Sequence, residues 1–131
     1  SKGEHEVFVV EADEYDRSFL ALWPTVAVVT NVEADHLDIY ADLADITATF
    51  SEYVRRARYV VLCADDPGAN ALPSPATAEV IRYGITSPDA RLVAHDIRTE
   101  AGGSVFQVKY DGKPMGEVRL RVPGQHNVRN A

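Results

Sequence analysis

Three short runs of consecutive apolar residues, rich in β-branched side chains, lie in the first half of the chain. They cover residues 7–10, 26–30 and 59–63, and a polar or acidic residue follows each of them within two positions. Continuous runs of this length are typical of strands that are buried on both faces of a parallel sheet. We therefore predict three buried strands in this half of the chain.

Residues 42–57 carry apolar side chains at spacings of three and four, which is the pattern of an amphipathic helix. These side chains are Leu43, Ile46, Phe50, Tyr53 and Val54. Asp42 or Asp45 is placed to cap the N-terminus of this helix. A helix between two buried strands forms a βαβ unit, so we expect a parallel sheet with right-handed crossovers.

The second half of the chain has shorter apolar runs, which Gly and Pro residues separate. The predicted strands are residues 80–83, 92–97, 105–110 and 117–122. Asp111 and Gly112 form a hairpin signal between the last two. The fold class that follows is α/β. A parallel sheet with flanking helices covers residues 1–77, a smaller antiparallel β part covers 78–123, and a helix begins within 124–131.

Composition is that of a globular protein and argues against two classes of partner. The 131 residues fit one domain, with 46% hydrophobic and 25% charged residues. A formal net charge of −7 argues against a nucleic-acid partner, which requires clustered Lys and Arg. No apolar run approaches the roughly 20 residues that span a bilayer, so no membrane association is expected. The single cysteine, Cys63, has no disulfide partner in the chain, which indicates a cytoplasmic location.

Acidic residues gather where the first two predicted strands end. Four acids occur in residues 11–16, and residues 31–36 contain two acids followed by His36. Because the carboxyl ends of parallel strands meet at one edge of a sheet, we expect Glu11 and His36 to lie side by side. Carboxylate oxygens with an imidazole nitrogen and water suit Mg²⁺ or Mn²⁺. Each acid taken alone also fits helix capping or solvation, and we interpret His5 and His95 as structural residues without a ligand.

Three other chemistries lack the residues that they require. A zinc site is not indicated, because the one cysteine and four histidines show neither Cys-x-x-Cys nor His-x-x-x-His spacing. A serine hydrolase is not indicated either, because the chain has no Gly-x-Ser-x-Gly elbow. A complete P-loop is also absent, so the cradle for ATP phosphates is expected to lie outside the chain.

Three motifs occur in the order in which Mur ligases carry them. They are Val-Glu-Ala-Asp-Glu-Tyr-Asp-Arg-Ser-Phe-Leu at residues 10–20, Thr-Asn-Val-Glu-Ala-Asp-His-Leu-Asp at 30–38 and Gly-Gln-His-Asn-Val-Arg-Asn-Ala at 124–131. Along essentially its whole length the chain resembles this family. The resemblance implies a central ATPase domain. In the full enzyme a UDP-sugar-binding domain and the P-loop would lie before Ser1, and an amino-acid-binding domain after Ala131.

The resemblance also implies a reaction, that of an ATP-dependent ligase of peptidoglycan synthesis. Within the family, the chain is similar to the branch whose substrates are UDP-N-acetylmuramate and L-alanine. In that reaction ATP phosphorylates the sugar carboxylate, the amine of L-alanine attacks the acyl phosphate, and phosphate leaves. Two Mg²⁺ ions would neutralise charge on the triphosphate and on the transition state.

The motifs assign roles to five residues. By motif match, Glu11 corresponds to the ligand of the Mg²⁺ that bridges the β- and γ-phosphates, and His36 to the ligand of the second Mg²⁺. His126, Asn127 and Asn130 match the segment that meets the adenine and ribose of ATP, where an amide can both donate and accept. Without the resemblance, Asn127 would be interpreted as a helix N-cap. Further acids that would orient the metal ligands are Asp13, Glu14, Asp35 and Asp38.

Two departures from the family pattern limit what the chain is expected to do. Several relatives carry a carbamylated lysine in the helix after the histidine, whereas this chain has Ala48, Thr49 and Phe50 there. That absence fits the alanine-adding branch better than the later-acting ligases. Without a P-loop and an amino-acid domain, the isolated chain is expected to be inactive. The alternatives are a ligase that recycles a preformed tripeptide onto UDP-N-acetylmuramate, and a non-catalytic binding module.

Overall fold

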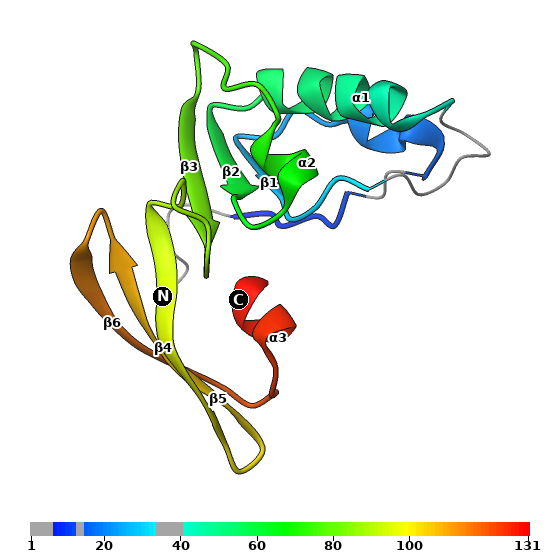
Figure 1. Ribbon diagram of the computed structural model, residues 1–131. Helices are drawn as coiled ribbons and strands as arrows, with labels where there is room; N and C mark the ends of the chain where they lie inside the picture. The colour runs from blue at the N-terminus through cyan, green and yellow to red at the C-terminus, as the bar shows by residue number, and fades with distance from the viewer. Residues whose placement is uncertain (1–6, 13–14, 34–40) are drawn as a thin grey trace, which may run out of the picture.

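The computed structural model describes residues 7–12, 15–33 and 41–131. In these ranges it has a six-stranded sheet of order β1-β2-β3-β4-β5-β6 with helices beside it (Figure 1). The elements in chain order are η1 (Tyr15–Ala21), β1 (Val26–Val29), α1 (Leu43–Arg55), β2 (Tyr59–Cys63), α2 (Pro67–Asn70), β3 (Glu79–Gly84), β4 (Leu92–Glu100), β5 (Gly103–Tyr110), β6 (Lys113–Leu120) and α3 (Gln125–Arg129). The α/β fold class predicted from the sequence, with a parallel and an antiparallel part, is confirmed.

The parallel part of the sheet is larger than predicted. β1, β2 and β3 run parallel, with Tyr59 opposite Glu79 where β2 and β3 begin. The antiparallel direction expected for residues 80–83 is therefore wrong, because the chain crosses over through α2 before it enters β3. Gly and Pro residues indicate where strands end, but they do not indicate whether neighbouring strands run parallel or antiparallel. β3 pairs with β4 only at two positions, and the antiparallel β4–β5–β6 part turns away from the parallel strands there (Figure 1).

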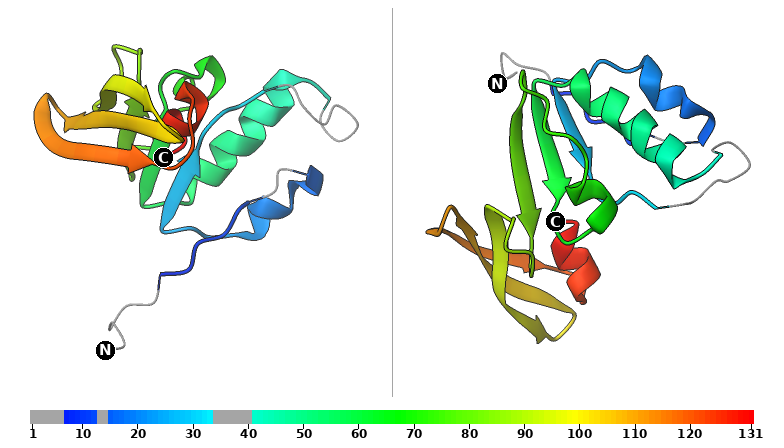
Figure 2. Two further views of the ribbon diagram at one scale, coloured as in Figure 1. Left: turned by 90° about the horizontal axis from the view of Figure 1, so that it is seen from below. Right: turned by 45° about the horizontal axis from the view of Figure 1, so that its top comes forward.

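Helix α1 covers one face of the parallel strands, as the apolar spacing predicted (Figure 2). It begins after Asp42, whose side chain accepts a hydrogen bond from the backbone N–H of Asp45 at 2.9 Å and so caps the helix. Val54 of α1 and Leu62 of β2 are both fully buried. They belong to one core cluster, to which β1 and η1 also contribute buried side chains. Burial of this apolar face against the sheet is the main force that holds α1 in place.

The apolar run at residues 7–10 does not form the buried strand that was predicted. Val7, Phe8 and Val9 are 84%, 90% and 87% exposed, and the segment belongs to no strand. A central parallel strand needs a hydrogen-bonded neighbour and a packed layer on each face. The described residues supply neither to this segment. One face of β1 likewise lacks a fully covering layer. Val26 and Val28 on that face are exposed, whereas Ala27 and Val29 on the other face are buried.

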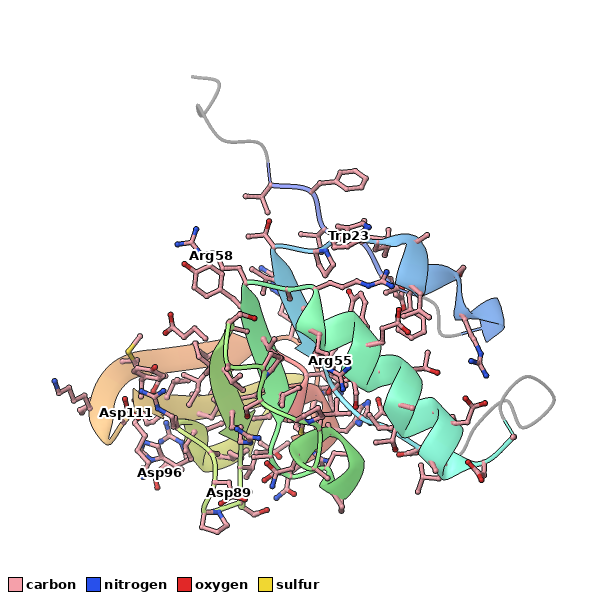
Figure 3. The ribbon with its side chains drawn as sticks, turned by 90° about the horizontal axis from the view of Figure 1, so that it is seen from above. Trp23, Arg55, Arg58, Asp89, Asp96 and Asp111 are labelled. Carbon is pink, nitrogen blue, oxygen red and sulfur yellow. The ribbon has the colours of Figure 1, made fainter. Side chains whose placement is uncertain are left out.

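The hairpin between β5 and β6 forms where the sequence predicted it. Asp111 and Gly112 have φ angles of 48° and 78°. A two-residue hairpin turn of type I′ requires a positive φ at both of these positions. Arg91 donates two hydrogen bonds to the carboxylate of Asp111, at 2.8 and 2.6 Å. These bonds lower the pKa of Asp111. Figure 3 labels Asp111, which lies at the turn between β5 and β6.

None of the helices within residues 7–12, 15–33 and 41–131 is both long and apolar enough to cross a membrane.

Candidate functional site

The carboxyl ends of β1 and β2 meet at one edge of the sheet, where ligands of open parallel sheets collect. Residues 30–33 leave β1 there, and residues 64–66 lead from β2 into α2. The two segments are tied together. Asp66 Oδ1 accepts hydrogen bonds from the backbone N–H of Val32 at 3.1 Å and from that of Ala69 at 2.7 Å. Val32 is 5% exposed, so its backbone position is set by packing as well as by this bond.

Glu11 is exposed and lies in a segment without regular structure. Figure 2 shows residues 7–12 apart from the loop that follows β1. His36 lies outside the described residues, and so do Asp13, Glu14, Asp35 and Asp38. The expected pairing of Glu11 with His36 therefore stays a prediction.

The donor chemistry of Glu11 fits a hard divalent cation, whereas an imidazole such as that of His36 is a less usual ligand of Mg²⁺. An exposed carboxylate such as that of Glu11 offers the oxygen ligands that Mg²⁺ prefers, and water completes such a shell. Within residues 7–12, 15–33 and 41–131, no three His, Cys, Asp or Glu side chains come together in a group that could hold a metal ion. A site built from Glu11 thus depends on groups beyond those ranges.

The three residues predicted to meet the nucleoside lie together, His126 and Asn127 on α3 and Asn130 at its C-cap. Asn130 Nδ2 lies 3.1 Å from Nε2 of His126, and because an amide nitrogen donates, this ring nitrogen is the acceptor. Asn127 Nδ2 donates to the backbone carbonyl of Pro123 at 2.7 Å. Both amide nitrogens are thus engaged, that of Asn130 within the motif and that of Asn127 by the residue just before it. The motif is anchored by Val128, whose side chain is buried.

The alternative interpretation of Asn127 as the N-cap is wrong. The N-cap position is Gly124, which has φ 104° and makes no side-chain hydrogen bond to the helix. A positive φ of this size suits glycine, which has no Cβ to clash with its own backbone. Asn127 instead lies in the first turn of α3 and points its amide nitrogen back to residue 123. This bond links the first turn of α3 to the residue that precedes Gly124.

An apolar hollow of about 230 Å³ lies between α3 and the face of the sheet opposite α1. Its walls include Val28, Val61 and Tyr83, with Val128 and Arg129 on the helix side. Burial, with the thiol of Cys63 as a second contribution, raises the pKa of Tyr83 to about 12. Arg129 Nε is buried there without a hydrogen-bond partner among the described residues. The sequence singled out neither Tyr83 nor Arg129, because each gains these surroundings only from segments distant in the chain.

The chain is similar to known proteins over its whole length. The model of the Mur ligase middle domain matches residues 1–131. UDP-N-acetylmuramate–L-alanine ligases of Salinibacter ruber and Acidothermus cellulolyticus are 44% and 51% identical to the chain, over 98% of it. The chain spans 28% of the length of each, just over a quarter.

Solved structures show the same relationship. The crystal structure of UDP-N-acetylmuramate–alanine ligase from Thermotoga maritima matches with a TM-score of 0.73 and 25% identity, over 87% of this chain and 25% of that one. The ligase of Neisseria meningitidis that acts on UDP-N-acetylmuramate and the peptide L-alanyl-γ-D-glutamyl-meso-diaminopimelate matches with a TM-score of 0.67. It is 28% identical, over 86% of this chain and 34% of that one.

Proposed function

The chain belongs to the Mur ligase family, whose middle-domain model covers all of its residues, and on this basis we propose that it is the ATP-binding part of a ligase joining L-alanine to UDP-N-acetylmuramate. The observation that carries this proposal is the 51% identity to a relative of that name, over 98% of the chain. The chain spans 28% of the length of that relative. The proposed activity therefore belongs to a longer protein, in which further domains bind the sugar nucleotide and the amino acid.

In the proposed reaction the residues of this chain hold ATP and its metal ions. Glu11 and His36 each provide a ligand to one Mg²⁺. Bound Mg²⁺ would neutralise charge on the triphosphate while the γ-phosphoryl group passes to the sugar carboxylate and ADP leaves. L-Alanine then attacks the acyl phosphate through its amine, and phosphate leaves. Since no P-loop occurs in the 131 residues, the isolated chain is not expected to turn over substrate.

The nucleoside end of ATP is assigned to α3. The side-chain amides of Asn127 and Asn130 donate through their nitrogens to Pro123 and His126, which leaves their carbonyl oxygens to accept from the amino group of adenine. The buried Val128 between them holds the helix against the sheet. Two acceptors held in place in this way favour a base that carries an amino group, such as adenine, over a base that has no amino group to donate.

Replacing Asn130 is expected to weaken ATP binding in the full-length ligase. Asn130→Ala removes one acceptor and the partner of His126, so the KM for ATP should rise about three- to tenfold with little change in kcat. Gln125→Ala is the matched control, because Gln125 is an exposed amide residue of the same helix. Steady-state kinetics with varied ATP measure both. An unchanged KM for ATP in Asn130→Ala would remove this residue from the nucleotide site.

The choice of L-alanine is tested by comparing amine substrates with the full-length ligase. Phosphate release that depends on UDP-N-acetylmuramate is expected with L-alanine and at a much lower rate with the tripeptide L-alanyl-γ-D-glutamyl-meso-diaminopimelate. The tripeptide ligase remains the second candidate, because its Neisseria meningitidis representative is 28% identical to the chain. A preference for the tripeptide would select that candidate. Absence of phosphate release with either substrate would favour a non-catalytic binding module.

A further inference from the structure

The antiparallel part of the sheet is joined to the parallel part over a short stretch. β3 and β4 pair only where Tyr83 lies opposite Leu92 and Gly84 opposite Val93. α3 follows β6 at the end of the antiparallel part and returns to lie beside β4 (Figure 1). The place of α3 against the sheet therefore depends on how the antiparallel part is attached, as well as on the burial of Val128.

Asp65, which follows the last strand residues of β2, holds the first three residues after β3. Its carboxylate accepts backbone N–H bonds from Ile85 at 2.7 Å, Thr86 at 3.0 Å and Ser87 at 2.8 Å. The hydroxyl of Thr86 donates a further bond to Oδ1 at 3.2 Å. Burial acts to raise the pKa of Asp65, but these bonds outweigh it and the pKa is lowered. An ionised carboxylate thus ties the start of the connection between β3 and β4 to the neighbouring strand.

Gly84 leaves the room that this carboxylate occupies. A Cβ placed on Gly84 would lie 2.7 Å from Oδ1 of Asp65 and 2.9 Å from its Cγ. Gly84 is itself buried at the end of β3. Any side chain at this position would therefore displace the carboxylate from the three N–H groups.

The segment that Asp65 holds also lines the hollow beside α3. Tyr83, Gly84 and Ile85 line this hollow from the end of β3, and Val128 and Arg129 line it from α3. A displacement of Ile85 would change the surface against which α3 is packed, because close-packed side chains leave little free space to absorb it. Asp65 is thereby connected to α3 through the residues that it bonds.

We propose that Asp65 is a positioning residue for the nucleotide site, which sets through residues 85–87 where α3 lies against the sheet. The inference rests on the proposed function, since it takes Asn127 and Asn130 to meet the adenine of ATP. Asp65 touches neither of these residues. Without it α3 is less fixed, and the binding of ATP then has to order the helix, which costs affinity.

The first test measures the mobility of α3 in the full-length ligase without any nucleotide. Hydrogen exchange of the backbone amides in residues 125–131 should be about tenfold faster in Asp65→Ala than in the wild type. Asp66→Ala is the matched control. The adjacent Asp66 also accepts two backbone N–H bonds, but its partners Val32 and Ala69 do not line the hollow. Asp66→Ala should therefore leave exchange in residues 125–131 unchanged.

The second test measures nucleotide binding without the sugar nucleotide, so that no turnover is involved. Asp65→Ala is expected to raise the Kd for ATP about three- to tenfold. The Kd for ITP, whose base carries no amino group, should be the same in the variant and the wild type. In steady-state kinetics the KM for ATP should rise while kcat changes less than about twofold.

Two further variants keep these tests decisive if Asp65→Ala does not fold. Gly84→Ala changes no charge and displaces the Asp65 carboxylate, so it should reproduce both the faster exchange and the weaker ATP binding. Asp65→Asn retains one of the two acceptor oxygens and should lie between the wild type and Asp65→Ala in both measurements.

Three outcomes would overturn the proposal without affecting the proposed function. Wild-type exchange of residues 125–131 in both Asp65→Ala and Gly84→Ala would show that Asp65 does not hold α3. Equal acceleration in Asp65→Ala and Asp66→Ala, or equal losses of ATP and ITP affinity, would mean that general loss of stability is responsible. Unchanged ATP affinity in Asp65→Ala, while Asn130→Ala weakens it, would reject the positioning role and leave the nucleotide site standing.

A failure of the proposed function looks different. If Asn130→Ala binds ATP as the wild type does, the assignment of α3 to the nucleotide is wrong, and the proposal for Asp65 is rejected with it.

Discussion

Glu11→Gln in the full-length ligase is expected to lower kcat by about 10²- to 10³-fold, and His36→Ala should do the same. Each change removes a proposed ligand of one Mg²⁺, and the charge stabilisation that such an ion supplies in the transition state amounts to several kcal/mol. Glutamine keeps the length of the Glu11 side chain and removes only its charge. Single-turnover phosphate release at saturating ATP and Mg²⁺ measures the effect on the chemical step.

The control for this prediction is a carboxylate of the same kind that is not assigned to the metal. Glu33 is exposed and lies in the loop that follows β1, three residues before His36. Glu33→Gln should leave kcat within about twofold of wild type, as is usual for an exposed residue without a partner in the reaction. Wild-type turnover in both Glu11→Gln and His36→Ala, with native circular dichroism, would refute the metal assignment.

Leu62→Ala is expected to cost the chain about 2–5 kcal/mol of its free energy of unfolding. Leu62 is completely buried in β2, where the core formed by β1, β2 and α1 surrounds its side chain. Truncation removes that apolar contact area and leaves a cavity which the packed neighbours fill only in part. A loss of this size is a large share of the stability of an ordinary domain. Urea unfolding followed by far-UV circular dichroism measures it as a fall in midpoint at constant slope.

Leu43→Ala is the matched control, because it makes the same chemical change at the first residue of α1. Leu43 is 48% exposed, and alanine has a good helix propensity, so the expected loss is below about 1 kcal/mol. Similar losses in both variants would mean that the side chain of Leu62 does not lie in the core that holds β2 to α1.

Elements with a local chemical signal were predictable from the sequence. The apolar spacing and the capping aspartate located α1, which begins at Leu43 after Asp42. Asp111 and Gly112 located the β5–β6 hairpin, because both positions need a positive φ and these residue types accept it. The helix at the chain end was foreseen from its motif, and α3 begins at Gln125. In each case neighbours along the chain decide the conformation.

Predictions that depended on a distant partner were less secure. The direction of β3 was wrong, since only its pairing with β2 makes it parallel. Residues 7–10 have the composition of a buried strand and are exposed, because the described chain offers them no neighbouring strand and no covering layer. Composition shows that a segment favours burial. It does not show what would bury it.

Family membership and the ordered motifs that carry Glu11, His36 and Asn130 were readable from the sequence alone, because a motif is a property of consecutive residues. Only the tertiary structure joined Asp66 to Val32 and set Gly68 against the same backbone. Adjacent aspartates look alike in a sequence, yet Asp65 and Asp66 hold opposite neighbours of β2. The physical reason is that a side-chain oxygen bonds whichever N–H the packed strands bring within about 3 Å, and that choice is made when segments distant in the chain come together.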